Sequence, residues 1–481
     1  MISSALTIAA AEWRYWFRSK LGAASAVLAF ILICTSLVAT ISQIKSERET
    51  REAFQLTAEE TFRNQPARHP HRMVHYGHYV FRAPTSLAAL DPGVEPYTGT
   101  VMFLEGHRQN SAVFSSTYDG AHAGPFARMT PALTYQLLVP IILIVMGFAV
   151  VAREREAATG QQLITFGVSP SAIWLGKTLA LLSVAGLMLI PLLIGTVLSG
   201  SASGAAVGFF ILYALYLVVW VMIIVAASTW SQRSSTSFLV LVTIWIGLCV
   251  LVPRVVASSA NASIPSPSQV ETEMDIALAL RAIGDGHNAN APVFDQLKAK
   301  LLEDYGVERI EDLPINFRGV VAQEAEEDIS RVMNKFADKR MTNQVAQVDF
   351  VHSLEFLSPL LALQSASMIT AGTDVRTHHR YLREAEEIRY QFVQGLNKSH
   401  IEQMSYNDDI NRSSSPEAEQ RTRVSAENWR RVLDDFHFEP EPATDRLARI
   451  VPSQFVLILW GLFAACLGCL GASRLKEVNN G

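Results

Sequence analysis

The chain has 481 residues, of which 49% are hydrophobic and 18% are charged. Soluble proteins usually carry about 25% charged residues, so this composition disfavours a soluble protein and predicts apolar residues gathered into membrane-spanning segments. The net charge of -5 and the lack of a large basic cluster argue against nucleic acid as a partner.

Residues 1–20 are predicted to form an amphipathic helix that lies in the membrane surface. Apolar and aromatic side chains from Ile2 to Phe17 recur at helical spacing, and we expect Glu12 and Arg14 on the opposite, polar face. Trp and Tyr, which are frequent here, prefer the membrane interface. The alternative is that this stretch is only the flank of the first span.

Six long apolar runs follow along the chain. Each is long enough to cross about 30 Å of hydrocarbon as a helix. The sequence therefore predicts an all-α polytopic membrane protein with six transmembrane helices. The predicted helices, TM1 to TM6, cover residues 21–44, 132–152, 172–198, 205–229, 235–252 and 451–472.

Two large polar insertions lie between the predicted spans. The first, 45–131, is expected to be mixed, with some β structure. The second, 253–450, shows helical periodicity and is expected to form a helical domain after a Pro-rich linker around 264–267. A short tail, 473–481, follows the last span.

The orientation follows from Lys and Arg near the ends of the spans, because cytoplasmic segments are enriched in them. Arg153 and Arg155 follow the second span. Arg233 lies between the fourth and fifth spans, and Arg474 follows the sixth. The short connection 199–204 has no charge. We therefore expect both termini in the cytoplasm and both large insertions to be extracytoplasmic.

The connection 153–171 carries the most informative pattern. Residues 153–163 read Arg-Glu-Arg-Glu-Ala-Ala-Thr-Gly-Gln-Gln-Leu, residues 166–170 read Phe-Gly-Val-Ser-Pro, and Gly-Lys follows at 176–177. This pattern resembles the one in type 2 ABC exporter permeases (ABC-2 type), which reads Glu-Arg-Glu, Gly-Thr, a Leu-rich helix, a Ser or Pro turn and Gly-Lys. Ala158 departs from the family because it occupies the usual Gly place, so we expect this junction to be capped differently.

The resemblance implies that 153–171 is a cytoplasmic coupling helix that docks into a separately encoded ABC ATPase. A short charged helix between two spans can transmit a push from a soluble partner to both of them. The alternative is an ordinary solvated loop with paired Glu and Arg. The residues expected to contact the ATPase are Glu154, Arg155, Glu156, Thr159 and Leu163.

Further motifs resemble a narrower bacterial subgroup of these permeases that carries a domain-of-unknown-function label. The resemblance covers nearly the whole chain. It implies a multi-pass protein of the bacterial inner membrane that forms a homodimer, or a heterodimer with a sister permease. The motifs are His69-Pro70-His71-Arg72, His75-Tyr76-Gly77, Asp91-Pro92-Gly93, Tyr97-Thr98-Gly99, Glu105 to Asn110, Phe126 to Ala132, Ser358-Pro359, Ala371-Gly372-Thr373-Asp374 and His378.

The chain lacks the loop that binds the phosphates of ATP. That loop needs Gly-x-x-x-x-Gly-Lys-Ser/Thr, and the Gly-Lys-Thr at 176–178 has Ser171 where the first Gly would stand. We therefore expect no catalytic residue, no cofactor and no enzyme activity in this chain, with ATP and Mg held by the partner subunit.

Histidines are frequent in the first insertion, and such a group suggests a metal site. No Cys or carboxylate nearby in the sequence completes a recognisable ligand set. We therefore expect these histidines to be structural and hydrogen-bonded, with no bound metal. They are His69, His71, His75, His78 and His107.

Acidic residues of the second insertion are not expected to be functional, because nothing nearby marks a nucleophile or a metal. Glu384, Glu386 and Glu387 are expected to form a solvated face of a helix. The segment 407–415, which begins Asn-Asp-Asp, is expected to be a flexible turn and not a cation-binding loop.

Ionisable residues are nearly absent from the spans, whereas ion-coupled carriers usually place Asp, Glu or His within them. This pattern disfavours an ion-coupled carrier. Pro140 in the second span and Pro191 in the third loosen backbone hydrogen bonding. They are the expected pivots for opening a path, and simple packing is the alternative reason for their presence.

The leading hypothesis is the membrane permease subunit of a type 2 ABC transporter, an exporter by family resemblance, driven by the separate ATPase. The alternative is a mechanotransmitter, in which ATP hydrolysis moves the outer domains against a periplasmic partner without moving a substrate through the membrane. A membrane-anchored enzyme ranks third, because no nucleophile, base and orienting group can be assembled from these insertions by motif.

Overall fold

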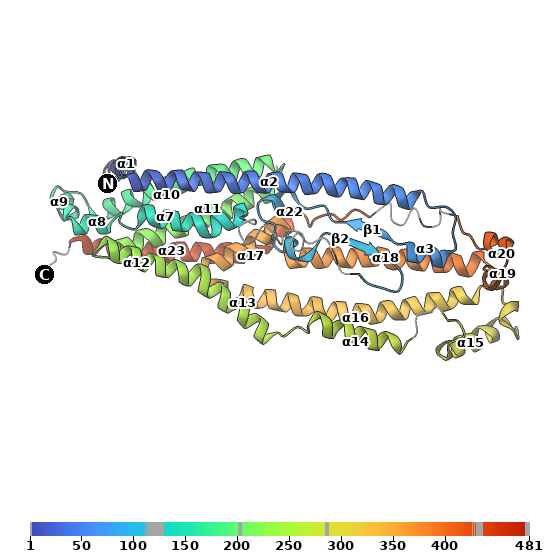
Figure 1. Ribbon diagram of the computed structural model, residues 1–481. Coiled ribbons are helices and arrows are strands. Elements are labelled where there is room, and N and C mark those ends of the chain that lie inside the picture. The colour runs from blue at the N-terminus through green and yellow to red at the C-terminus, as the bar shows by residue number, and fades with distance from the viewer. Residues whose placement is uncertain are drawn as a thin grey trace.

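A computed structural model describes residues 2–110, 112, 129–200, 204–283, 288–425, 427, 429 and 436–476. The molecule is elongated, with the apolar helices in one half and a projecting domain in the other (Figure 1). We use "projecting domain" for the described residues of 64–110 and 264–450, and "terminal end" for the opposite extremity, where the first and last described residues lie. Residues 126–128 and 477–481, which belong to a predicted motif and to the predicted tail, lie outside the described residues.

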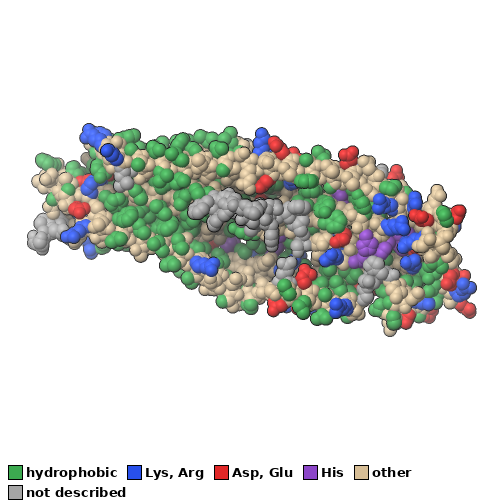
Figure 2. All heavy atoms as spheres, viewed as in Figure 1, with side chains coloured by type: hydrophobic (Ala, Val, Ile, Leu, Met, Phe, Trp, Pro, Cys, Tyr) green, Lys and Arg blue, Asp and Glu red, His purple; other side chains and the backbone are tan. Residues whose placement is uncertain are grey.

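Six helices of the described chain are long and apolar enough to cross a membrane, which confirms the predicted all-α polytopic fold. Their hydrophobic side chains cover one half of the molecule in Figure 2. The spans are Gly22–Arg63, Pro131–Glu156, Pro170–Leu198, Gly204–Trp230, Ser234–Ser263 and Val451–Ser473.

These spans are built from eleven helical elements of the described chain, two of which are single π-helical turns. The elements are α2 (Lys20–Arg63), α6 (Pro131–Leu133), the π turn Thr134–Leu138, α7 (Val139–Gly147), α8 (Ala152–Glu156), α10 (Pro170–Leu198), α11 (Gly204–Trp230), α12 (Ser234–Ile246) with the π turn Gly247–Leu251 and α13 (Val252–Ser263), and α23 (Val451–Ser473).

The central span is α11, which contacts α7, α10, α12, α17 and α23. Its aromatic side chains Phe209, Tyr213, Tyr216 and Trp220 are fully buried in the largest hydrophobic core of the protein. The outer spans expose apolar side chains on their far faces, for example Phe30 on α2 and Phe463 on α23. This distribution is expected for helices whose surroundings are lipid.

The first span does not end at the predicted residue 44 but continues as one helix to Arg63. Residues 45–63 contain no Gly or Pro, and their charged side chains form exposed pairs four residues apart, such as Lys45 with Glu49, that favour a helix. Phe62 at the far end is buried in the core of the projecting domain. The helix therefore connects the membrane half directly to the projecting domain (Figure 1).

The projecting domain combines a small sheet with long helices, as predicted for the two insertions. Strands β1 (His78–Phe81) and β2 (Val101–Leu104) pair antiparallel, with His78 opposite Leu104. The helices are α3 (Pro70–Tyr76), α4 (Glu95–Thr98), α14 (Gln269–Arg281), α15 (Asp295–Tyr305), α16 (Phe317–Ser353), α17 (Pro359–Ala371), α18 (Val375–Gln403), α19 (Tyr406–Asn411), α20 (Pro416–Arg421) and α22 (Ala443–Arg449). Short 3-10 turns are Ser86–Ala89, Pro292–Phe294, Ile310–Asp312, Glu355–Leu357 and Arg474–Lys476.

Helix α17 is a feature that the sequence did not predict. It is too short to span a membrane, yet nearly all of its side chains are buried between α11 and α23. Ser358 caps its start, accepting a hydrogen bond from Leu360 N and donating one to Leu248 O at 2.6 Å. Helix α17 thus joins the projecting domain to the membrane half.

The predicted surface helix is α1 (Ile2–Arg18), and its orientation corrects one expectation. Ile2, Leu6 and Phe17 are exposed, whereas Glu12, expected on the polar face, is only 2% exposed. Helix α1 packs along α10, and Glu12 meets two cations there. The prediction was wrong because helical periodicity alone does not distinguish a face that meets water from a face that meets another charged helix.

Candidate functional site

The connection between the second and third spans lies at the terminal end (Figure 1). It is not the single helix expected for 153–171, because the chain turns between α8 and α9 (Thr159–Thr165). Ala158 at this turn has a φ of 56°, in the left-handed region that L-residues other than Gly seldom adopt. Ala158 precedes α9 without a side-chain hydrogen bond that caps the helix, and the different capping expected at this junction stays a prediction.

Glu154 on α8 points inward. Its carboxylate lies 2.5 Å from Lys177 Nζ on α10 and accepts a hydrogen bond from the Thr159 hydroxyl at the start of α9. Lys177 Nζ also lies 2.7 Å from Glu12 on α1, and Glu12 lies 3.0 Å from Arg153. Two cations and two anions thus hold α1, α8, α9 and α10 together.

The Gly-Lys pair at 176–177 has a structural role in this network. A Cβ on Gly176 would lie 2.6 Å from Ala5 O, so the missing side chain lets α1 approach α10 closely. Lys177 is the next residue and reaches both carboxylates from that contact. The pair that resembles the end of a phosphate-binding loop therefore serves helix packing.

Arg155 and Glu156 contact two further spans. Arg155 Nη2 donates to Gly471 O at the end of α23, at 3.5 Å. Glu156 accepts hydrogen bonds from the backbone N and the hydroxyl of Ser234, at 3.2 and 2.8 Å, which caps the start of α12. Leu163 on α9 packs against the membrane core. The five residues expected to contact an ATPase therefore all make contacts within the chain.

The outward face of this connection is formed by other residues. Gln161, Gln162 and Thr165 on α9 are exposed, and Phe166 at its end is 84% exposed. Gly167, with a φ of 86°, ends the helix: Val168 N donates to Leu163 O and Gly167 N to Ile164 O. The sequence pattern contained Phe166 but gave it no role. The signal in the sequence that could have identified Phe166 was an aromatic residue directly before Gly in a short polar connection.

Comparison with known families gives two matches, which divide the chain at the start of α14. Residues 111–269 match the family described as ABC-2 family transporter protein, and residues 271–439 match a domain of unknown function, DUF3526. The chain therefore carries an ABC-2 transporter permease domain, followed by the unassigned domain. It is an ABC transporter permease, and the combination with an unassigned domain was also predicted. No curated protein and no solved structure matches the chain.

Each of the two prolines predicted as pivots lies near a tyrosine that donates a hydrogen bond to a backbone carbonyl. Pro140 offers no N–H to Gln136 O, and Tyr216 Oη donates to that oxygen at 2.7 Å instead. Near Pro191, Tyr135 Oη donates to Met188 O. Both helices are thereby held in the present conformation, and movement at either proline stays a prediction.

Motifs far apart in the permease sequence meet beside α17. Thr373 Oγ1 donates to Asp91 O at 3.0 Å, and Val94 N donates to Thr373 O at 3.0 Å. Gly93 has a φ of 50°, and a Cβ there would lie 2.5 Å from Thr373 O. The Asp-Pro-Gly and Gly-Thr-Asp motifs are thus two sides of one contact that fixes the first insertion onto the second.

A cavity of about 1730 Å³ opens in the projecting domain of the permease. Its walls carry both apolar and charged side chains, so it suits an amphipathic ligand better than an ion. Lining residues include Ala257, Ile276, Met341, His378, Arg383 and Tyr390, from α13, α14, α16 and α18.

Proposed function

We propose that this permease is the membrane subunit of an exporter in the bacterial inner membrane, driven by a separately encoded ATPase that binds α9. The observation that carries the proposal is Phe166, 84% exposed at the end of a connection whose charged residues contact four other helices, α1, α10, α12 and α23. Exposed aromatic side chains are frequent anchors of protein interfaces. ATP and Mg²⁺ belong to the partner in this scheme.

The contacts around α8 describe how a push on α9 would spread. A movement of α9 would pass through Glu154 and Lys177 to α1 and α10. It would reach α12 through Glu156 and Ser234, and α23 through Arg155. The ion pair of Glu154 with Lys177 is short and shielded, the hydrogen bond of Glu156 with Ser234 is exposed, and Arg155 lies 3.5 Å from Gly471 O. Together these contacts connect α8 to α10, α12 and α23. The proposed docking surface is therefore Gln161, Gln162, Thr165 and Phe166, with Glu154, Arg155, Glu156, Thr159 and Leu163 transmitting the movement.

We further propose that two permeases pair through their poorly covered spans. The span Ser234–Ser263 is the least buried of the six candidates, with 17% of its most apolar window buried in the single chain. A homodimer, or a heterodimer with a sister permease, would cover this face. Both large insertions would then stand together on the periplasmic side, where they receive or gate the cargo.

The test is stimulation of the partner ATPase by the permease, with the two proteins co-reconstituted in liposomes. Phe166→Ala should raise the concentration of ATPase needed for half-maximal stimulation by about 10-fold to 100-fold, the range for loss of a central aromatic anchor. Phe54→Ala is the matched control, because Phe54 is also an exposed Phe (65%) but lies on the far part of α2. Equal stimulation by both variants would exclude α9 as the docking element.

A further inference from the structure

Three histidines converge on one side of the projecting domain. His71 and His75 lie four residues apart on α3, on the same face of that helix, and His107 lies in the turn after β2. One ring nitrogen from each lies within 4.8 Å of the others. Figure 2 shows histidine side chains gathered at the surface in this half of the molecule. The fold thus brings together residues that the sequence separates.

The backbone holds His107 in place. Its φ of 61° is in the left-handed region, which is unfavourable for a residue with a Cβ. Gly106 N donates to Val74 O at 3.1 Å, and a Cβ on Gly106 would overlap the Val74 side chain, so the turn presses closely against α3. His107 keeps this unfavourable backbone conformation next to two other potential ligands, which indicates that its side chain is required at this position.

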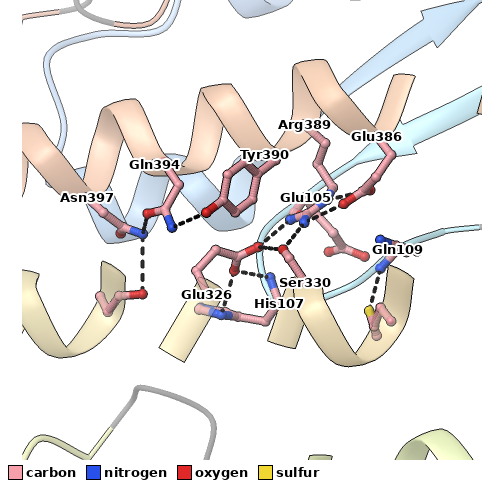
Figure 3. A network of polar contacts seen from close by, with 12 residues as sticks. Glu105, His107, Gln109, Glu326, Ser330, Glu386, Arg389, Tyr390, Gln394 and Asn397 are labelled. Atoms are coloured by element: carbon pink, nitrogen blue, oxygen red, sulfur yellow. Dashed lines mark hydrogen bonds and ion pairs between the residues drawn. The ribbon is translucent and has the colours of Figure 1, made fainter. Parts of the chain in front are cut away.

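A buried carboxylate stands behind His107 (Figure 3). Glu326 Oε2 accepts a hydrogen bond from His107 N at 3.0 Å and lies 3.2 Å from His107 Nδ1. On its other side Glu326 is paired with Arg389 at 2.6 Å, and both side chains have no exposed surface.

A carboxylate in contact with a histidine ring often supports metal binding by that histidine. A carboxylate that accepts the proton on one ring nitrogen leaves the lone pair on the other nitrogen, and metal-binding histidines usually have such a partner. Neutral imidazole is a good ligand for Zn²⁺ and Cu²⁺. A tetrahedral ion with metal–nitrogen bonds of 2.0–2.1 Å requires nitrogens about 3.3 Å apart, so the three rings need to close by a small rotation of their side chains.

We propose that His71, His75 and His107 bind a divalent transition-metal ion, Zn²⁺ or Cu²⁺, and that Glu326 positions His107 for it. Water or another donor completes the coordination. The ion would tie α3 to the turn after β2 and, through Glu326, to α16. This site is independent of the docking proposed for α9, and it reverses the expectation that these histidines are only structural.

The second histidine cluster, His69, His400 and Asp409, serves a different purpose. Both ring nitrogens of His69 are engaged: Nδ1 accepts from His71 N at 3.2 Å, and Nε2 lies 3.1 Å from Asp409. Asp409 also faces Arg412 at 3.2 Å, and this positive charge would repel a metal ion. The first part of the segment 407–415, expected to be a flexible turn, thus belongs to helix α19 and carries a buried carboxylate paired with several side chains, and a turn follows it. The prediction that His69 is structural agrees with these contacts.

The experiment measures Zn²⁺ binding by the full-length permease, purified in detergent with an affinity tag that contains no histidine. Equilibrium dialysis against Zn²⁺, with the metal counted by mass spectrometry, should give one tightly bound ion per chain. His75→Ala should weaken binding at least 10-fold, and because His75 is exposed its removal should not prevent folding. His437→Ala is the matched control, since His437 is exposed and outside the cluster.

A second measurement separates binding from folding. Zn²⁺ should raise the Tm of the wild type and of His437→Ala, because a ligand that binds only the folded state stabilises it. It should leave the Tm of His75→Ala and His71→Ala unchanged. The proposal is overturned if the wild type binds no stoichiometric Zn²⁺ or Cu²⁺, or if His75→Ala binds them as tightly as the wild type does.

Discussion

At the scale of single residues, the connection between the second and third spans depends on conformations that most side chains avoid. Ala158 takes the left-handed conformation so that α9 can turn away from α8 while Thr159 keeps its hydrogen bond to Glu154. The methyl group of Ala tolerates this conformation at a cost of about 1–2 kcal/mol relative to the right-handed one. A β-branched side chain tolerates it less well.

Ala158→Val should therefore lower the free energy of unfolding by about 1–2 kcal/mol. Ala158→Gly should change it by less than about 0.5 kcal/mol, because relief of the backbone conformation is offset by the greater freedom of Gly in the unfolded chain. Thermal unfolding in detergent measures both. Ala157→Val is the control, since Ala157 is also exposed and has a φ of -91°; equal melting temperatures for the two Val variants would contradict the argument.

Buried histidines in the projecting domain predict a pH dependence of stability. Burial, together with the nearby charge of Arg82, lowers the pKa of His378 to about 3, compared with about 6.5 in an unfolded chain. The folded state therefore binds fewer protons than the unfolded state between these values. Stability is full above pH about 6.5 and decreases as the pH falls towards 3, by about 1.4 kcal/mol per pH unit for this group.

His378→Gln should accordingly reduce the loss of Tm between pH 7 and pH 5. The comparison is with the wild type and with His437→Gln, in which an exposed histidine is replaced. Thermal unfolding at a series of pH values gives the slope for each protein. The same slope in all three would show that His378 is already accessible to protons in the folded state.

At the scale of elements, α1 is held by ionic contacts within the protein and not only by the membrane surface. Trp16 Nε1 donates to Met146 O at 3.1 Å and Trp13 Nε1 to Ser183 Oγ at 2.8 Å, which fixes α1 against α7 and α10. The charges of Glu12 and Lys177 are then shielded between the helices, with side chains 2% and 4% exposed. Removing one partner leaves the other charges uncompensated.

Lys177→Met should lower stability by about 3–5 kcal/mol, the usual cost of breaking a buried ion pair. It should also increase hydrogen exchange in α1 and α9, because both lose their common anchor. The control is Lys45→Met, which breaks the pair with Glu49 on the exposed part of α2, where Lys45 is 76% exposed; that change should cost less than about 1 kcal/mol. Hydrogen exchange measured by mass spectrometry compares the two, and unchanged exchange in α1 would contradict the anchoring role.

At the scale of the whole molecule, the two extremities are chemically different. The terminal end carries α1, α8, α9 and both described chain ends, while the projecting domain carries the sheet, the histidines and the large cavity. The positions of Arg153, Arg155, Arg233 and Arg474 at the terminal end predict that this end faces the cytoplasm.

A membrane-impermeant maleimide tests this orientation in spheroplasts. A cysteine introduced by Gln161→Cys on α9 should react only after the membrane is permeabilised. A cysteine introduced by Glu402→Cys, at the exposed end of α18 in the projecting domain, should react in intact spheroplasts. The chain without either substitution corrects for its four native cysteines. Labelling of Gln161→Cys from outside would invert the orientation and remove the basis for docking at α9.

The sequence by itself determined the six spans, the mixed first insertion, the helical second insertion and the family. These depend on the length of apolar runs and on short motifs, which are local properties set by the thickness of the bilayer and by turn geometry. Even the unusual junction at Ala158 was visible as a departure from a local pattern.

Only the tertiary structure decided which charged groups face one another. Glu12 and Lys177 are 165 residues apart, and His107 and Glu326 are 219 apart, so no local period relates them. The inward direction of Glu154, the burial of α17 and the convergence of three histidines follow from how the helices pack. The charged face of a helix can contact either water or an opposite charge on another helix. The sequence pattern does not distinguish these two environments, and the packing of the helices decides between them.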